Sequence, residues 1–214
     1  GIIRVIPNGM DPEHYAAPFD PAPILELHPA LRGRRVLLFL SRLHPKKGLP
    51  LLLTSWRALA TRFPDWVLLV AGDPDSPHGR EVVDGARDLA AAGRVVFAGA
   101  VQGRLKDAAL GAAHLFVLPS LSENFGQVVL EALASGLPAI VSRACPWGEI
   151  ESRECGWWVP PEVATLHRTL ETAMKMDAPL LAAMGARGRA WALHEFGWPE
   201  IAAKLAGLYR EIET

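Results

Sequence analysis

A short basic stretch is the first part of this sequence with side chains suited to chemistry. The stretch Ser41–Gly48 contains Arg42 and Lys47 and lies just ahead of a predicted helix. From Leu27 to Pro64 the sequence has eight Lys or Arg residues and no Asp or Glu. A guanidinium and an ammonium group near a helix N-terminus favour a phosphate or diphosphate ligand. The alternative is that the stretch is an ordinary solvated basic loop.

A pair of glutamates is the second such feature. Glu123 and Glu131 are the only charged residues between positions 107 and 143. Glu131 shares a four-residue spacing with Gln127 and Ser135, which predicts one polar stripe on an otherwise apolar helix. Two carboxylates several ångströms apart suit a ligand with hydroxyl groups at both ends, such as a sugar nucleotide. The alternatives are that Glu131 merely faces water and that Glu123 caps the helix.

Backbone groups beside these glutamates add to the predicted site. Gly126 lets the backbone approach a ligand closely, and the N–H groups from Phe125 to Val128 could donate to an anion. The pair Gly72-Asp73 follows another predicted strand and is interpreted as a plain turn.

Other residue types give little support for a reactive centre. The seven histidines show no metal-ligand spacing. Cys145 and Cys155 are expected to be small buried residues, since no histidine lies near either in sequence. Trp147, Trp157 and Trp158 could stack on a base or sugar, but packing against a helical tail is the favoured interpretation.

The composition limits the class of protein. The 214 residues are 50% hydrophobic and 21% charged, with a formal net charge of −1. This balance excludes a disordered chain, a collagen-like fibre and a basic nucleic-acid coat, so no nucleic-acid partner is expected. No apolar run approaches the roughly 18 residues of a membrane-spanning helix, and no signal peptide is apparent. We expect a cytoplasmic α/β protein.

Strand and helix patterns alternate along the chain. Apolar runs predict strands at 36–40, 66–70, 94–97, 114–118 and 138–141. Helical spacing predicts helices near 49–63, 80–92, 103–113 and 126–135, and a helical tail near 162–176, 179–195 and 198–212. The repeated order predicts a Rossmann-like, doubly wound parallel sheet with helices on both faces.

The first thirty residues do not follow this alternation. Ile2–Ile6 resembles a strand, ends at the turn Pro7-Asn8-Gly9, and is followed by a proline-rich stretch. We therefore expect residues 1–30 to be a connecting segment whose strand belongs to a sheet outside this chain. Residues 31–214 are expected to form the nucleotide-sugar-binding domain.

Several motifs together resemble the C-terminal, donor-binding half of retaining glycosyltransferases of family 4 (group 1), which have the GT-B fold. The resemblance covers nearly the whole chain. Ser41-Arg42-Leu43 with Lys47-Gly48 is similar to the phosphate loop of that family. The run from Pro119 to Pro138, with its two glutamates, is similar to the family signature. The segments 146–149 and 155–159 are similar to a subgroup that assembles bacterial surface polysaccharide, including lipopolysaccharide.

The resemblance implies roles for individual residues. Arg42 and Lys47 would stabilise the donor diphosphate as leaving group. Glu131 would accept hydrogen bonds from the ribose hydroxyls. Glu123 would hold the donor sugar, and Arg42, Lys47 and Glu123 would be the catalytic residues. Further donor-binding positions are implied on the same loop and near the base: Asn124, Phe125, Gly126, Gln127, Val128 and Gly99.

The resemblance also sets expectations for partners. The donor would be a nucleotide diphospho-sugar, and neither a cofactor nor a metal ion would be needed. A glycan or lipid-linked acceptor would bind to an N-terminal half that is absent from this chain, so the chain alone would transfer sugar poorly or not at all. The full protein could associate peripherally with the inner face of a membrane. The alternatives are a non-catalytic nucleotide-sugar-binding module and a GT-B sugar-nucleotide epimerase.

Two positions depart from the family pattern. Asn124 stands where a small residue is usual, and Ser41 stands where glycine is usual. Both are compatible with donor binding and bear on the choice of sugar.

Overall fold

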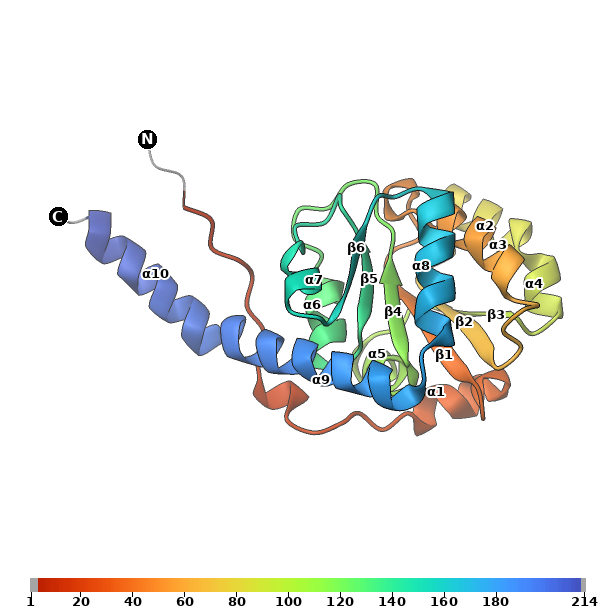
Figure 1. Cartoon of the computed structure of the whole chain (residues 1–214), viewed down its shortest axis with the longest axis horizontal. Coiled ribbons are helices and arrows are strands. Elements are labelled where there is room, and N and C mark those ends of the chain that lie inside the picture. The colour runs from red at the N-terminus through yellow and green to blue at the C-terminus, as the bar shows by residue number, and fades with distance from the viewer. Residues whose placement is uncertain (1–3, 213–214) are drawn as a thin grey trace.

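A computed structural model describes residues 4–212 of the chain. Six parallel strands form one sheet in the order β3-β2-β1-β4-β5-β6 (Figure 1). The strands are β1 (Arg35–Leu40), β2 (Trp66–Ala71), β3 (Val95–Gly99), β4 (Leu115–Leu118), β5 (Ala139–Ser142) and β6 (Gly156–Val159). The order reverses between β1 and β4, which makes the sheet doubly wound, as predicted.

Helices cover both faces of the sheet. Right-handed crossovers place α2 on one face and α5 and α6 on the other, because the direction of travel along the sheet reverses after β3. The helices are α1 (Ala22–Leu27), α2 (Leu49–Leu59), α3 (Pro77–Gly85), α4 (Arg87–Ala91), α5 (Gly103–Ala112), α6 (Gln127–Ala134), α7 (Glu149–Ser152), α8 (Val163–Lys175), α9 (Ala178–Glu195) and α10 (Trp198–Ile212).

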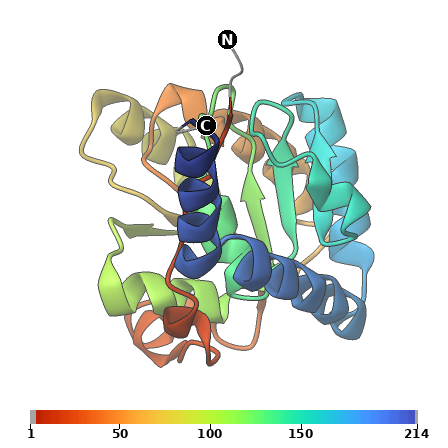
Figure 2. The same ribbon diagram turned by 90° about the vertical axis from the view of Figure 1, so that its left-hand side faces the viewer.

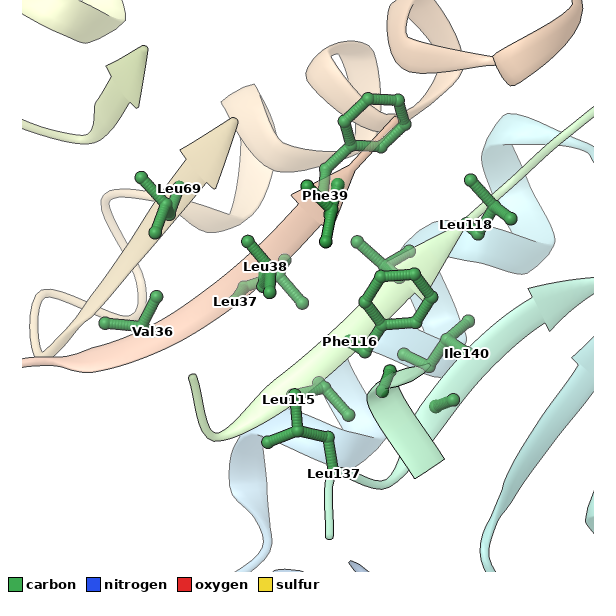
Figure 3. Close-up of a cluster of buried hydrophobic side chains, with 14 of the residues drawn as sticks. Val36, Leu37, Leu38, Phe39, Leu69, Leu115, Phe116, Leu118, Leu137 and Ile140 are labelled. Atoms are coloured by element: carbon green, nitrogen blue, oxygen red, sulfur yellow. The ribbon is translucent and has the colours of Figure 1, made fainter. Parts of the chain in front are cut away.

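The two central strands carry the core. Leu37, Leu38 and Phe39 of β1 are fully buried, as are Leu115 and Phe116 of β4. Figure 3 shows these side chains packed between neighbouring strands. Continuous apolar runs are typical of strands that are covered on both faces, so the burial follows directly from the sequence pattern.

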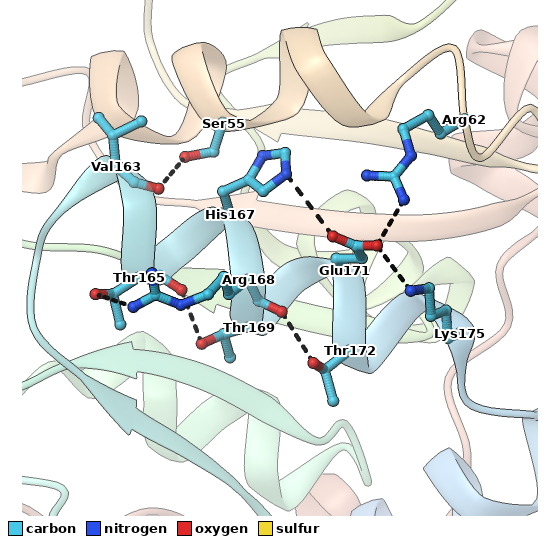
Figure 4. Close-up of polar contacts among 10 residues, drawn as sticks. All are labelled: Ser55, Arg62, Val163, Thr165, His167, Arg168, Thr169, Glu171, Thr172 and Lys175. Carbon is cyan, nitrogen blue, oxygen red and sulfur yellow. Dashed lines mark hydrogen bonds and ion pairs between the residues drawn. The ribbon is translucent and has the colours of Figure 1, made fainter.

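Helix α8 returns to the face that α2 covers and packs against it (Figure 4). Its first carbonyl, at Val163, accepts a hydrogen bond from the buried Ser55 hydroxyl of α2. Near the other end, Glu171 pairs with Arg62 at 2.6 Å and with Lys175 at 2.7 Å. The contacts of Val163 with Ser55 and of Glu171 with Arg62 attach the helical tail to the sheet domain, whereas the Lys175 pair lies within α8.

Three short elements of the structure were not predicted from the sequence. Strand β6 has only four residues, two of them tryptophans, so its pattern is too short to separate from a loop. Helix α7 has four residues, and α1 begins inside a proline-rich stretch. The single helix predicted near 80–92 is in fact two, α3 and α4, separated at Ala86.

The leading segment is not a strand over its described residues. Val5 and Ile6 have no strand neighbour, and Ile2 and Ile3 lie outside the described residues. The first described residue with backbone hydrogen bonds is Met10, whose N–H donates to Phe196 O and whose carbonyl accepts from Trp198 N. From there the chain packs on the domain, with Tyr15 and Ile24 buried. Residues 4–9 and α10 both extend away from the sheet on the same side (Figures 1 and 2).

Candidate functional site

The two predicted site loops follow neighbouring strands. The loop after β1 carries Arg42 and Lys47, and the loop after β4 carries Glu123. In an open parallel sheet, ligands bind where the strand order reverses, at the carboxyl ends of the strands. Both predicted loops therefore lie at the edge of the sheet where folds of this kind bind ligands.

The loops touch through their backbones. The N–H of Leu121 donates to Lys46 O at 2.7 Å. Gly48 adopts a left-handed conformation, and a Cβ atom there would lie 2.0 Å from Pro119 O. No side chain fits at Gly48, so glycine allows the close approach of the two loops.

An ion pair completes the junction. Lys47 Nζ contacts Glu123 Oε2, and their side chains are only 15% and 13% exposed. The Ser120 hydroxyl lies 3.5 Å from the same carboxylate oxygen. Helix α6 is capped by Gly126 without a side-chain hydrogen bond, so the interpretation of Glu123 as a helix cap is wrong. The carboxylate instead holds the ammonium group of the other loop.

Helix α6 presents the predicted polar stripe. Gln127, Glu131 and Ser135 are half-buried, as is Val128, whereas the other apolar side chains of the helix are buried. The Val129 N–H donates to Gly126 O at 2.8 Å, whereas the N–H groups of Gln127 and Val128 lie at the very start of the helix, where intrahelical acceptors are lacking. Gly126 has a φ of 80°, in the left-handed region that glycine adopts readily.

Glu131 does not simply face water. Its carboxylate pairs with Lys106 Nζ at 3.0 Å, and the two side chains are 14% and 29% exposed. Lys106 belongs to α5, the helix that follows β3, whose last residue is Gly99. Lys106 was not predicted as a site residue, because it lies on a helix and not in a loop that follows a strand. The sequence feature that could have identified it is a lysine in the first turns of a predicted helix that begins at the carboxyl edge of the sheet.

Tyr15 also lies close to this acidic group. Burial, together with the negative charges of Glu131 and Asp107, raises the pKa of the Tyr15 hydroxyl well above its usual value. The neighbouring His14 contacts Asp107 of α5 at 3.2 Å. At neutral pH the phenol is uncharged, as an ordinary tyrosine is, and the shift extends this neutral state to higher pH.

Arg42 lies on the same loop as Lys47, five residues before it. Its exposed side chain lines a depression of about 530 Å³ together with Asp73, Asp75 and His78. Gly72, at the start of that neighbouring loop, would place a Cβ atom 2.1 Å from Ser41 O. The Gly72-Asp73 turn thus packs directly against the basic loop, which the interpretation as a plain turn did not anticipate.

Asn124 and Phe125 line a separate cavity of about 750 Å³ beside the loop after β4. Trp147 forms one wall and donates its indole N–H to Phe125 O at 2.5 Å. Trp147 also packs on Trp191 and Phe196, as predicted for contact with the helical tail. Cys145 and Cys155 are free and buried, also as predicted.

The described part of the chain has neither a cluster of metal-ligating side chains nor a helix able to cross a membrane. Within residues 4–212, no group of three or more His, Cys, Asp or Glu side chains is placed to hold a metal ion. None of the helices described there has both the length and the apolarity that a bilayer crossing requires.

The fold and its reversal point define a Rossmann-like α/β domain of the kind found in GT-B glycosyltransferases. The chain belongs to the family of glycosyl transferases group 1, whose pattern matches residues 27–191.

Individual relatives agree with this assignment. The chain is 32% identical over 210 residues to a phosphatidyl-myo-inositol mannosyltransferase of Mycolicibacterium smegmatis, covering 97% of this chain and 51% of the relative. It is 29% identical to the lipopolysaccharide core biosynthesis mannosyltransferase LpsB of Rhizobium meliloti, covering 97% and 60% of the two chains. The chain thus spans about half the length of these relatives.

In two solved structures, about half of the solved chain is likewise similar to nearly the whole of this chain. The Anabaena protein Alr3699/HepE, solved with UDP and glucose, is 25% identical with a TM-score of 0.81, covering 97% of this chain and 56% of that one. Sucrose-phosphate synthase from Thermosynechococcus elongatus is 28% identical with a TM-score of 0.79, covering 98% and 52%.

Proposed function

We propose that this chain is the donor-binding half of a retaining, family 4 glycosyltransferase. The full enzyme would transfer a sugar from a nucleotide diphospho-sugar to a glycan or lipid-linked acceptor in surface polysaccharide or lipopolysaccharide synthesis. The main support is the Lys47–Glu123 ion pair, which joins the two loops at the reversal point of the sheet. In the proposal, the cation of this pair would contact the diphosphate and the carboxylate would contact the sugar hydroxyls.

The proposed reaction breaks the bond between the anomeric carbon and the diphosphate oxygen. Negative charge develops on the departing diphosphate, where Arg42 and Lys47 would stabilise it. The acceptor hydroxyl oxygen forms the new bond to the anomeric carbon, and its proton passes to an oxygen of the departing diphosphate. Because the two cations supply the positive charge, the proposal needs no metal ion or other cofactor.

The remaining residues would position the donor. Glu131 would accept hydrogen bonds from both ribose hydroxyls, with Lys106 holding its carboxylate in place. Glu123 and the backbone from Asn124 to Gly126 would hold the sugar, and Gln127 and Val128 would contribute free N–H groups. The backbone near Gly99 would meet the base.

Partners and location follow from the same proposal. The acceptor would bind to a preceding half of the protein, and α10 would pack across that half. The exposed Leu205 and Tyr209 side chains of α10 offer an apolar surface for this contact. We place the full enzyme in the cytoplasm, at the inner face of a membrane where lipid-linked acceptors are found.

Calorimetry with uridine, guanosine and adenosine diphosphates tests the donor site. We expect one nucleotide to bind best and Glu131→Ala to weaken it. Glu26→Gln, which changes an exposed carboxylate on α1, is the matched control. Equal binding of all three nucleotides by wild type and Glu131→Ala would contradict the proposal. Sugar transfer that appears when the preceding half is added would separate an enzyme from a binding module.

A further inference from the structure

A depression of about 410 Å³ lies at the edge of the sheet opposite the proposed donor site. Its residues come from the chain just ahead of β1, from α1 and from the end of α5, and the junction of α8 and α9 reaches the same edge (Figure 1). The six residues of β1 separate this edge from the basic loop, a length of roughly 20 Å at the usual rise of a strand. None of the residues that line the depression has a role in the function proposed above.

The lining of this depression is positively charged. Its charged side chains are those of Arg32, Arg34, Arg35 and Asp65, so with a neutral histidine it has a net charge of +2. None of the three arginines forms an ion pair with another described residue. Burial lowers the pKa of Arg34, the positive charge of Arg94 lowers it further, and Asp65 offsets only part of this effect. Asp65 and Asp177 act on Arg35 only at longer range. The positive charges are therefore crowded and not neutralised.

Backbone carbonyls fix the orientation of two of these arginines. Arg34 and Arg35 donate to five carbonyls, those of Pro64, Trp66, Gly93, Met174 and Met176. A carbonyl orients a guanidinium group but carries only a partial negative charge, so the full positive charge persists. Cations that are held in place before a ligand arrives lose less entropy when it binds.

Hydrogen-bond donors beside the depression remain unused. Arg35 Nε is buried and has no acceptor among the described residues. The guanidinium carbon of Arg35 lies 4.2 Å from the centre of the Trp66 ring, and the indole N–H of this fully buried tryptophan also has no described acceptor. The exposed Arg32 makes one hydrogen bond, from Nε to Leu25 O at 3.2 Å, which leaves both of its Nη groups available. A ligand rich in acceptor oxygens complements this set of groups.

We propose that this depression binds a phosphate monoester in its dianionic form. The planar guanidinium fork matches a phosphate group in shape and charge, and a dianion balances the net charge of the lining. Pro21 and Leu25 add an apolar side to the depression, which leaves room for a small organic group on the phosphate. The volume lies within the range of small-molecule sites. This proposal does not depend on the donor site, which lies at the other edge of the sheet.

Inorganic phosphate is the first probe, titrated at constant ionic strength into the ¹⁵N-labelled 214-residue chain. We expect saturable shifts of the Gly33 and Gly111 amide signals, because both residues line the depression, and of the Trp66 indole N–H signal beside Arg35. The amide signals of Gly48 and Gly126 report separately on phosphate at the donor loops.

Two arginine variants with the same loss of charge test the assignment. Arg32→Gln removes an exposed side chain of the lining and should weaken phosphate binding about tenfold, as the loss of one charge-assisted hydrogen bond predicts. Arg168→Gln is the matched control and should bind like wild type, because Arg168 is an exposed residue of α8 whose guanidinium contacts only the Thr165 hydroxyl.

The phosphate group could belong to a soluble compound or to a lipid headgroup, and two further probes distinguish these sources. Saturable binding of glycerol 3-phosphate without sedimentation on vesicles would support the proposal with a soluble ligand. Sedimentation with phosphatidylcholine vesicles that requires added phosphatidic acid, and that is lost in Arg32→Gln, would support it with a lipid headgroup.

Three results would overturn the proposal. The first is a phosphate response confined to Gly48 and Gly126, which would leave the donor site as the only phosphate site detected. The second is an equal response to chloride, since ionic strength alone would then explain the shifts. The third is equal phosphate binding by wild type and Arg32→Gln. Failure of the donor site is recognised independently, by the nucleotide calorimetry described above.

Discussion

Lys47 of the loop after β1 and Glu123 of the loop after β4 form an ion pair across the point where the sheet reverses direction. Both side chains are largely shielded from water, so removing one partner leaves an uncompensated charge. We expect Lys47→Met and Glu123→Gln each to lower the free energy of unfolding by about 2 kcal/mol, and the double variant by less than the sum. Urea unfolding of the four proteins measures this coupling, with the exposed Lys46→Met as control. Strict additivity would show that the pair contributes nothing.

The same pair predicts opposite effects on two ligands. Glu123→Gln frees the Lys47 ammonium from its carboxylate, so a nucleoside diphosphate should bind as well as to wild type or a few-fold tighter. The intact nucleotide sugar should bind about tenfold more weakly, because a charged acceptor for its hydroxyls is lost. Calorimetry with both ligands on one variant checks the prediction. If the affinities for both ligands fell by the same factor, Glu123 would have no specific role in binding the sugar.

Glu131 should make the chain discriminate ribose from deoxyribose. A carboxylate that accepts a hydrogen bond from a ribose hydroxyl should make the affinity for a ribonucleoside diphosphate roughly tenfold or more higher than for its 2′-deoxy form. Glu131→Ala should bind both forms with the same reduced affinity. Lys106→Met should keep part of the preference, because the carboxylate remains but loses the ammonium group that positions it. A preference that survives in Glu131→Ala would assign the hydroxyl contact to another residue.

His114 should make stability depend on pH. Burial, reinforced by the charge of Arg35, lowers the pKa of His114 below the ordinary 6.5, and its Nδ1 accepts a hydrogen bond from Val36 N. The unfolded chain therefore binds more protons below pH 6.5. The free energy of unfolding should be constant above that pH and should fall as pH drops toward the folded pKa. His114→Asn, which keeps an acceptor for Val36, should flatten this dependence in urea titrations. A residual slope is expected from His28, whose pKa is also lowered by burial.

A chelator should leave donor binding unchanged. Arg42 and Lys47 supply the positive charge in the proposal, so EDTA or added Mg²⁺ should not alter nucleotide affinity by more than about twofold. Calorimetry in chelator-treated buffer checks this, with Arg42→Met as the variant that should lose affinity. Binding that requires Mg²⁺ would reassign the neutralising charge to a metal ion.

The fold followed from sequence where elements were long and strongly patterned. Five apolar runs predicted five of the six strands, and the doubly wound order followed from their alternation with helices. Strand β6 was missed because four residues carry almost no periodicity. It forms only because β5 offers it a free edge, with Ala139 paired to Gly156. That edge is a property of the assembled sheet and is not visible in the local sequence.

The candidate site was predicted in its residue types but not in its pairings. Sequence placed Lys47 and Glu123 on separate loops, and only the strand order shows that these loops are neighbours. Lys106 lies twenty-five positions before Glu131, and nothing in the spacing links the two residues. The cavity at Trp147 and Trp191 likewise depends on how α9 crosses the domain, because residues far apart in sequence form its walls.

Met10 links the first and last parts of the described chain. Its N–H and carbonyl are both bonded to the backbone at the junction of α9 and α10, through Phe196 and Trp198. The incoming and outgoing segments are therefore bonded to each other at one place. If a further lobe is attached through both segments, these two hydrogen bonds couple the two connections, so that neither can shift at this place without disturbing the other.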